Sequence, residues 1–106
     1  MNINLKAKQF ASYVKETPEF NAMYKSKMDL EKNKALKKKL DLYLSKKSSI
    51  YNRYDLDDVP KMLSRLNKEY EDFFNLPLIS NHINNTKQFN EMMEKAYKVI
   101  ESELLR

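Results

Sequence analysis

The sequence predicts an all-α fold of about five helices, and three observations support this prediction. None of the 106 residues is glycine, which supplies the positive φ angles of tight hairpins and phosphate-binding loops. The three prolines, at positions 18, 60 and 77, each stand where a helix can begin, because proline is tolerated in the first turn. Apolar residues recur every three or four positions. We expect a single helical domain over residues 1–106, with a long antiparallel, coiled-coil-like helical hairpin packed with N- and C-terminal helices.

The first helix is predicted from about Asn4 to Lys15, and the second from Pro18 to about Asn33. Thr17 is the expected N-cap of the second helix, because its hydroxyl can accept a hydrogen bond from a free backbone N–H of the first turn. The apolar stripe of the first helix comprises Ile3, Ala7, Phe10, Ala11 and Val14. The expected buried face of the second helix comprises Phe20, Met23, Tyr24 and Met28.

The third and fourth helices are predicted over about Asn33 to Tyr54 and Asp58 to Phe74. Their apolar positions alternate by four and three residues, as in a coiled-coil seam. A short segment, Asp55 to Asp58, joins them, which indicates an antiparallel hairpin. The seam residues are Leu36, Leu40, Tyr43, Lys47, Ile50 and Tyr54 in one helix and Val59, Leu63, Leu66, Tyr70 and Phe73 in the other. In this register Lys47 lies near Leu66 and Tyr70 and close enough to Glu69 to pair with it, and we expect its aliphatic stem to pack inward with the ammonium group at the rim.

The last helix is predicted from Leu76–Leu78 to Leu105, and its stripe contains two consecutive polar positions, Thr86 and Asn90. Buried polar residues in a helical interface can fix register or partner number at a cost in stability. The alternative is that the stripe shifts to Phe89, so that Asn90 lies at its edge. The expected stripe is Ile79, Ile83, Thr86, Asn90, Met93, Tyr97, Ile100 and Leu104, flanked by Phe89 and Ala96.

The composition is that of a globular protein, with 42% hydrophobic and 33% charged residues. No apolar run approaches the ~20 residues that a membrane-spanning helix needs, and no signal peptide is visible, so we expect a cytoplasmic protein without membrane contact. The chain contains no cysteine, which excludes disulfides, thiolate metal sites and a cysteine nucleophile.

Residues that carry chemistry occur without the partners they need. His82 is the only histidine, and Ser80 lies two residues away, on a different side of a helix. The turn contains three acids, Asp55, Asp57 and Asp58, but not the glycine that a calcium-binding loop needs. The last helix contains Glu91 and Glu94, but not the histidines that a di-iron site needs. We expect helix caps and solvated surface there, and therefore no catalytic residue, cofactor or metal.

The net charge of +5 is concentrated between residues 31 and 47, a segment that contains seven lysines and two acidic residues. At about 100° per residue, these lysines do not share one helical face, which favours a solvated surface over a nucleic-acid site. Contact with RNA phosphates remains the alternative. The candidate basic patch is Lys34, Lys37, Lys38, Lys39, Lys46 and Lys47.

The last helix also carries a candidate surface for self-association or partner binding. Methionine is flexible and polarisable, so neighbouring methionines are either core filler or an adaptable contact surface. The candidate surface is Phe89, Asn90, Met92 and Met93.

Three stretches together resemble the YlbF/YmcA family of small helical bacterial proteins, including its YheA-like members. These are Lys15-Glu16-Thr17-Pro18-Glu19-Phe20, the lysine- and leucine-rich hairpin, and Ile79 followed by Phe89-Asn90-Glu91-Met92-Met93. The resemblance implies an all-α protein that self-associates and has no catalytic centre. It also implies a regulatory role, since YlbF and YmcA act with a third protein on biofilm formation, competence and sporulation, and assist ribonuclease Y in RNA processing.

One departure from the family concerns cofactors. The regulatory members carry cysteines connected with an iron–sulfur cluster, whereas this chain has none, so cofactor binding does not carry over and a shorter, YheA-like branch is the nearer comparison. The leading hypothesis is a non-enzymatic, cytoplasmic helical adaptor that binds itself and a protein partner. The alternative is an RNA-binding accessory protein that uses the candidate basic patch.

Overall fold

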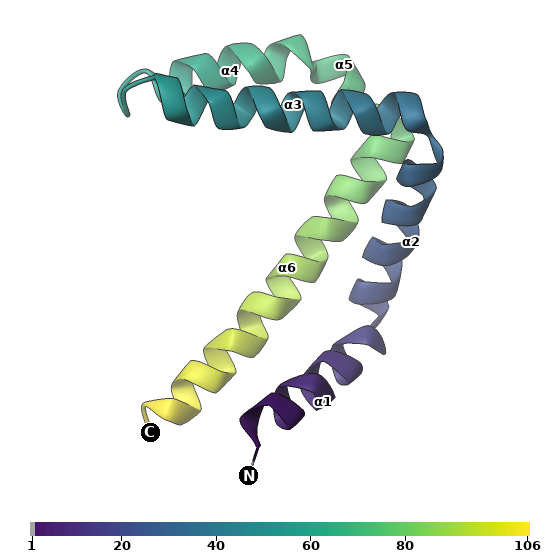
Figure 1. Ribbon diagram of the computed structural model, residues 1–106, viewed down its shortest axis with the longest axis vertical. Helices are drawn as coiled ribbons and strands as arrows, with labels where there is room; N and C mark the ends of the chain where they lie inside the picture. Colours follow the sequence, from purple (N-terminus) through teal and green to yellow (C-terminus); the bar gives the residue numbers. More distant parts are fainter. Residues whose placement is uncertain (1) are drawn as a thin grey trace. The chain divides into compact units, whose positions relative to one another are not determined.

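The computed structural model describes residues 2–106, and all their regular structure is helical (Figure 1). The predicted all-α fold is therefore confirmed. The six helices are α1 (Ile3–Lys15), α2 (Pro18–Lys32), α3 (Lys34–Arg53), α4 (Val59–Glu69), α5 (Glu71–Phe74) and α6 (Pro77–Leu104). The five predicted helices are all present, and the sixth arises because the predicted fourth helix is interrupted.

The chain divides into two compact units. Unit 1 comprises Met1–Met28 and Asn81–Arg106, and unit 2 comprises Asp29–Ser80. Helices α2 and α6 each contribute residues to both units. The organisation of the whole chain as one domain stays a prediction, and the two units are described separately below.

Polar side chains cap the first three helices. The backbone N–H of Phe20 donates to Thr17 Oγ1 at 3.2 Å, which confirms Thr17 as the cap of α2. The N–H of Leu36 likewise donates to Asn33 Oδ1 at 3.1 Å, and that of Asn4 donates to Asn2 Oδ1 at 2.9 Å. Each cap satisfies a backbone donor that has no partner inside the helix, so the sequence sets where these helices begin.

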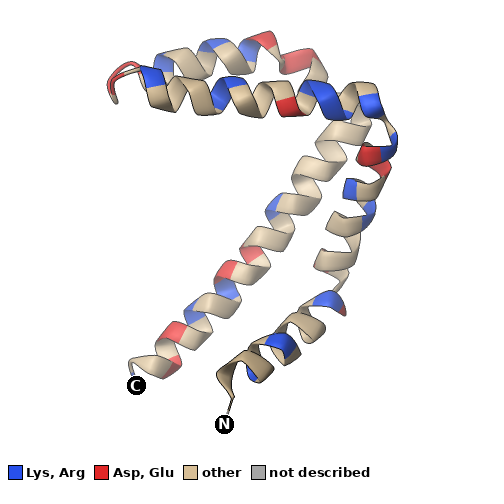
Figure 2. Ribbon diagram, viewed as in Figure 1, with Lys and Arg blue, Asp and Glu red and all other residues tan. Residues whose placement is uncertain are grey.

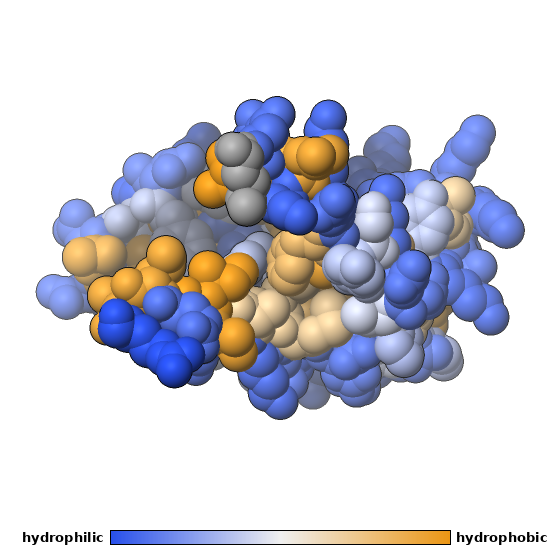
Figure 3. Space-filling view, turned by 90° about the horizontal axis from the view of Figure 1, so that it is seen from below, coloured by the Kyte–Doolittle hydropathy of each residue, from blue (hydrophilic) through white to orange (hydrophobic). Residues whose placement is uncertain are grey.

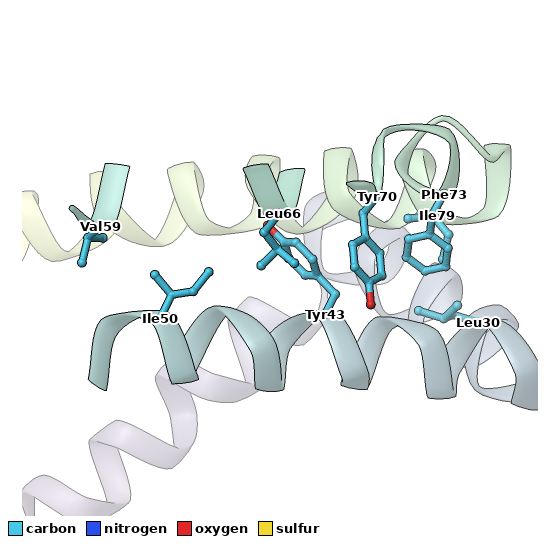
Figure 4. Packing of buried hydrophobic residues seen from close by; sticks show 8 residues of the cluster. All are labelled: Leu30, Tyr43, Ile50, Val59, Leu66, Tyr70, Phe73 and Ile79. Carbon is cyan, nitrogen blue, oxygen red and sulfur yellow. The ribbon is translucent and has the colours of Figure 1, made fainter. Parts of the chain in front are cut away.

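Unit 2 contains the hydrophobic core, which lies between α3 and α4 and extends to the neighbouring ends of α2 and α6 (Figure 4). The two long helices pack as the predicted antiparallel hairpin, whereas supercoiling of the pair stays a prediction. Aromatic rings dominate one end of this core. The Tyr43 ring lies 5.2 Å from that of Tyr70 and 4.7 Å from that of Phe74, both edge to face. The buried residues are Leu30, Tyr43, Ile50, Val59, Leu66, Tyr70, Phe73 and Ile79.

The prediction of one continuous fourth helix is wrong in one respect, because the observed helix is interrupted at Tyr70. This residue has φ −100° and ψ 10°, which separates α4 from the short α5. The break accompanies dense aromatic packing, since Tyr70 and Phe73 are buried and Phe74 is half-buried against the same core. Neither proline nor glycine marks the break, so the sequence pattern gave no sign of it.

Unit 1 pairs α2 with α6 through a stripe that is only half-buried. The Phe20 ring packs edge to face on Phe89, with 5.9 Å between the ring centres. The alternative prediction for α6 is therefore correct: the stripe shifts to Phe89, and Asn90 is exposed. The expected face of α2 was partly wrong, because Tyr24 and Met28 are exposed while Ser26 is buried. The inward face follows Phe20, Met23 and Ser26, a spacing of three residues that a polar serine hid.

Helix α1, also in unit 1, buries none of its residues. Its predicted stripe is exposed at Ile3, Ala7, Phe10 and Ala11, and only Val14 is half-buried. All the fully buried hydrophobic side chains among the described residues belong to unit 2. Unit 1 therefore has apolar stripes with no deep core to cover them.

Candidate interaction surfaces

Apolar side chains gather at the surface of unit 1 on α1 and on the last two turns of α6. Isoleucine 3 is 79% exposed and Leu104 is 78% exposed, values expected for polar rather than aliphatic residues. Figure 3 shows apolar side chains at the surface on the side where both termini lie. We call this set the terminal apolar surface: Ile3, Phe10 and Tyr13 of α1, Tyr97, Ile100 and Leu104 of α6, and the adjoining Leu105.

The exposure of this surface is energetically unfavourable in a lone chain. Covering an apolar side chain of this size yields roughly 1.5–3 kcal/mol. Helix α1 has 13 residues and buries none, whereas isolated helices shorter than ~12–15 residues are marginal in water. Large exposed apolar patches usually mark interaction sites. The terminal apolar surface is therefore the strongest candidate for a binding surface in unit 1.

The candidate surface taken from the sequence lies just before the terminal apolar surface on α6. Phe89 is half-buried because it packs on Phe20, and Asn90 is exposed. Met92 and Met93 are half-buried at the boundary between the α2–α6 stripe and the exposed end of α6. Thus Met92 and Met93 continue into the terminal apolar surface, whereas Phe89 already has an aromatic partner within the chain.

Three lysines of the candidate basic patch already contact other groups of the chain. Lys37 Nζ donates to Asp41 Oδ1 at 2.6 Å, one turn away on α3. Lys39 Nζ lies 5.3 Å from the centre of the Phe73 ring and 5.8 Å from that of Tyr70, within the range of cation–π attraction. Basic residues recur along the length of α3 (Figure 2). Lys46 contacts Glu69 and the Tyr70 ring.

Lys46, not Lys47, contacts the fourth helix. Lys46 Nζ donates to Glu69 Oε1 at 3.3 Å and lies 5.3 Å from the centre of the Tyr70 ring, whereas Lys47 is exposed. Hydrogen bonds to Tyr70 and Glu69 raise the pKa of Lys46. The predicted pairing of Lys47 with Glu69 was wrong by one residue, because a shift of one position rotates a side chain by about 100° around a helix.

A serine–histidine contact joins α2 to α6 inside unit 1. Ser26 Oγ lies 3.0 Å from His82 Nδ1 and donates to the backbone oxygen of Met23 at 2.9 Å. Since the Ser26 hydroxyl donates to Met23, His82 donates to Ser26 when its ring proton is on Nδ1, and the contact then links α2 to α6. Ser80, which was expected to point away from His82, donates to the backbone oxygen of Pro77 at 3.4 Å.

The half-buried His82 makes the stability of unit 1 depend on pH. Burial, and secondarily Lys27, lowers the pKa of His82 below its ordinary value of 6.5. The unfolded chain therefore takes up a proton first as the pH falls below about 6.5, and folding stability falls until the lower folded pKa is passed. Thermal unfolding at pH 7.5 and pH 5.0 should show a smaller loss of stability on acidification in His82→Gln than in the wild type. An equal loss in both proteins would contradict this assignment.

The described residues show neither a metal-binding cluster nor a membrane-spanning helix. Within residues 2–106, no three histidine, cysteine or acidic side chains are grouped so that they could hold a metal ion. None of the helices formed by these residues combines the length and the apolar character needed to cross a bilayer.

The match to a family model decides the relationship of the chain to other proteins. Residues 3–104 match the model described as "Control of competence regulator ComK, YlbF/YmcA". The chain belongs to the YlbF/YmcA family. This is a family of regulators, and the match runs from the start of α1 to the end of α6. No curated protein and no solved structure shows significant similarity to the chain.

Proposed function

We propose that this YlbF/YmcA-family protein is a non-catalytic, cytoplasmic regulatory adaptor that acts through protein–protein contacts, including contacts with a second copy of itself. The observation that carries the proposal is the terminal apolar surface, whose side chains are left exposed by the rest of residues 2–106. Membership in a regulatory family supports the same function. The process it regulates, by analogy with the family, is development or RNA processing.

Charge complementarity supports self-association through this surface. Helix α1 carries Lys6, Lys8 and Lys15 and no acidic residue. The exposed end of α6 carries Lys98, Glu101 and Glu103. Glu103 pairs with Arg106 at 3.1 Å, so Glu101 is the acid available to a lysine of α1. In a twofold dimer, α1 of one copy can lie on the end of α6 of the other, and symmetry repeats the contact. Such a contact joins apolar stripes and opposite charges at once, while Met92 and Met93 extend it along α6.

Affinity purification of the full chain from its native cell tests the adaptor function. We expect the wild-type protein to recover a second protein reproducibly, as identified by mass spectrometry. Because the partner should contact apolar side chains, the recovery should resist 0.5 M salt, which screens exposed charges. Recovery of no protein in repeated purifications would argue strongly against an adaptor.

RNA binding is the second candidate, and one observation favours it. Lys34, Lys38 and Lys47 on α3 are exposed, and none of them forms an ion pair in the part of the chain that the structure describes. Contacts between lysines and phosphates weaken steeply with salt because bound counterions are released. Titration of labelled single-stranded RNA at low and moderate salt tests this candidate, and no binding at low salt would exclude it.

A further inference from the structure

Unit 2 contains a groove between the two helices of the hairpin, with a volume of about 310 Å³. The buried side chains of Ile50 and Leu66 contribute apolar surface at its floor. At one end, Lys46 is paired with Glu69. The lining residues are Lys46, Ser49, Ile50, Arg53 and Tyr54, which precede the turn, and Met62, Arg65, Leu66 and Glu69 of α4.

The groove has an excess of positive charge that the chain does not neutralise. Lys46 and Glu69 offset each other, whereas neither Arg53 nor Arg65 forms an ion pair within residues 2–106. The guanidinium of Arg65 has only a weak contact, 4.0 Å from Met62 Sδ. Arginine presents a planar fork of donors that matches a carboxylate. Two unpaired arginines beside an aliphatic floor therefore suit a ligand that carries both carboxylates and apolar side chains.

The dimensions of the groove fit a short helical segment. From Lys46 to Arg53 the groove follows α3 for two turns, or about 10 Å at 1.5 Å per residue. An amphipathic helix can place two aliphatic side chains, three or four residues apart, over such a length. Carboxylates of the bound helix that flank its two aliphatic side chains would lie beside Arg53 and Arg65.

We propose that this groove binds an acidic amphipathic helix of a protein partner. The partner's aliphatic side chains contact Ile50, Met62 and Leu66, and its carboxylates pair with Arg53 and Arg65. This inference rests on the proposed adaptor function and adds the binding site and the chemistry of the partner. A peptide fits better than RNA, because the floor is aliphatic and Tyr54 is the only aromatic residue that lines the groove. Binding of RNA bases relies on stacking against aromatic faces.

Site-specific photo-crosslinking of the full chain in its native cell tests the proposal. The photoreactive residue p-benzoylphenylalanine replaces Tyr54, a groove residue of similar shape that is 43% exposed. In the control it replaces Leu44, which is also exposed and lies roughly opposite the groove at ~100° per residue along α3. We expect the Tyr54 probe to form an adduct with a protein segment that is net acidic and has aliphatic residues at helical spacing. The Leu44 probe should not label that segment.

Charge-reversal variants provide a second readout. The double variant R53E/R65E should reduce the yield of the Tyr54 adduct at least tenfold. The control K34E/K38E changes the net charge equally at exposed positions outside the groove and should leave the yield unchanged. Circular dichroism checks the helical content of each variant, and R53Q/R65Q, with the same expected loss, replaces R53E/R65E if that variant is unfolded.

The possible results separate this inference from the adaptor function. A Tyr54 adduct with RNA, an adduct with a segment that lacks acidic residues, or an unchanged yield in R53E/R65E would overturn the groove proposal. So would a partner that the wild type recovers without any Tyr54 adduct, although the adaptor function would then stand. If the wild type recovers no partner at all, both proposals fail.

Discussion

Replacing Phe73 by alanine is expected to lower the free energy of unfolding by about 3–5 kcal/mol, the typical cost of truncating a buried phenylalanine. Phe73 is only 3% exposed, and its ring lies 6.0 Å from that of Tyr70 and 5.5 Å from that of Phe74. Removal of the ring takes away these edge-to-face contacts and leaves a cavity in the only core that the described residues form. Urea unfolding followed by circular dichroism measures the change.

The matched control for Phe73→Ala is Leu44→Ala in the same unit. Leu44 is 51% exposed, so its truncation should change the free energy of unfolding by no more than about 0.5 kcal/mol. A cost below about 1 kcal/mol for Phe73→Ala would show that the aromatic cluster does not stabilise the hairpin in the way described.

The double substitution I100E/L104E is expected to raise the dissociation constant for self-association at least about 100-fold. Each apolar side chain that leaves an interface costs roughly 1.5–3 kcal/mol, and every 1.4 kcal/mol is a factor of ten in affinity. Both residues are exposed in the single chain, so their substitution should leave its helical content unchanged. Light scattering across a dilution series measures the mass and hence the dissociation constant.

The control for I100E/L104E is N81E/N84E, which adds the same negative charge at exposed polar positions of the same helix outside residues 96–104. We expect this control to associate as the wild type does. If both variants dissociate equally, charge rather than apolar contact would explain the effect. If neither changes the mass, the end of α6 is not part of the interface.

Local signals predicted most of the helical framework. Thr17 and Asn33 act as the N-caps that their residue types indicate, and Pro18 and Pro77 are the first residues of α2 and α6. The hairpin followed from two apolar stripes of matching period joined by a short acidic segment. These features depend on neighbours within a turn or two, which is why sequence alone can specify them.

Features that depend on three-dimensional packing were missed. The break at Tyr70 accompanies aromatic packing. Apolar periodicity could not show whether Lys46 or Lys47 contacts Glu69, because the two neighbouring residues are both lysine and differ only by their rotation about the helix axis. The Ser26–His82 contact joins residues far apart in the sequence, and nothing in the local pattern of α2 indicates that a serine faces inward. The groove was missed for the same reason, since Arg53 and Arg65 line the same groove only because of the register between the two helices of the hairpin.

The sequence did identify the apolar stripes of α1 and of the end of α6, but it did not predict that both would be exposed. An apolar stripe shows that a helix face is to be covered, not whether the cover comes from the same chain or from another one. In unit 1 the described chain supplies no cover for Ile3 or Leu104. The contact between chains that we propose would account for this difference.

Hydrogen–deuterium exchange of the wild-type protein at two concentrations tests most directly whether another copy covers the terminal apolar surface. The account predicts that backbone amides of α1 and of residues 96–104 exchange more slowly at 100 µM than at 1 µM, while those of α3 and α4 exchange equally at both. Identical exchange of α1 and residues 96–104 at the two concentrations, with light scattering showing only the 12.7 kDa monomer at both, would contradict it.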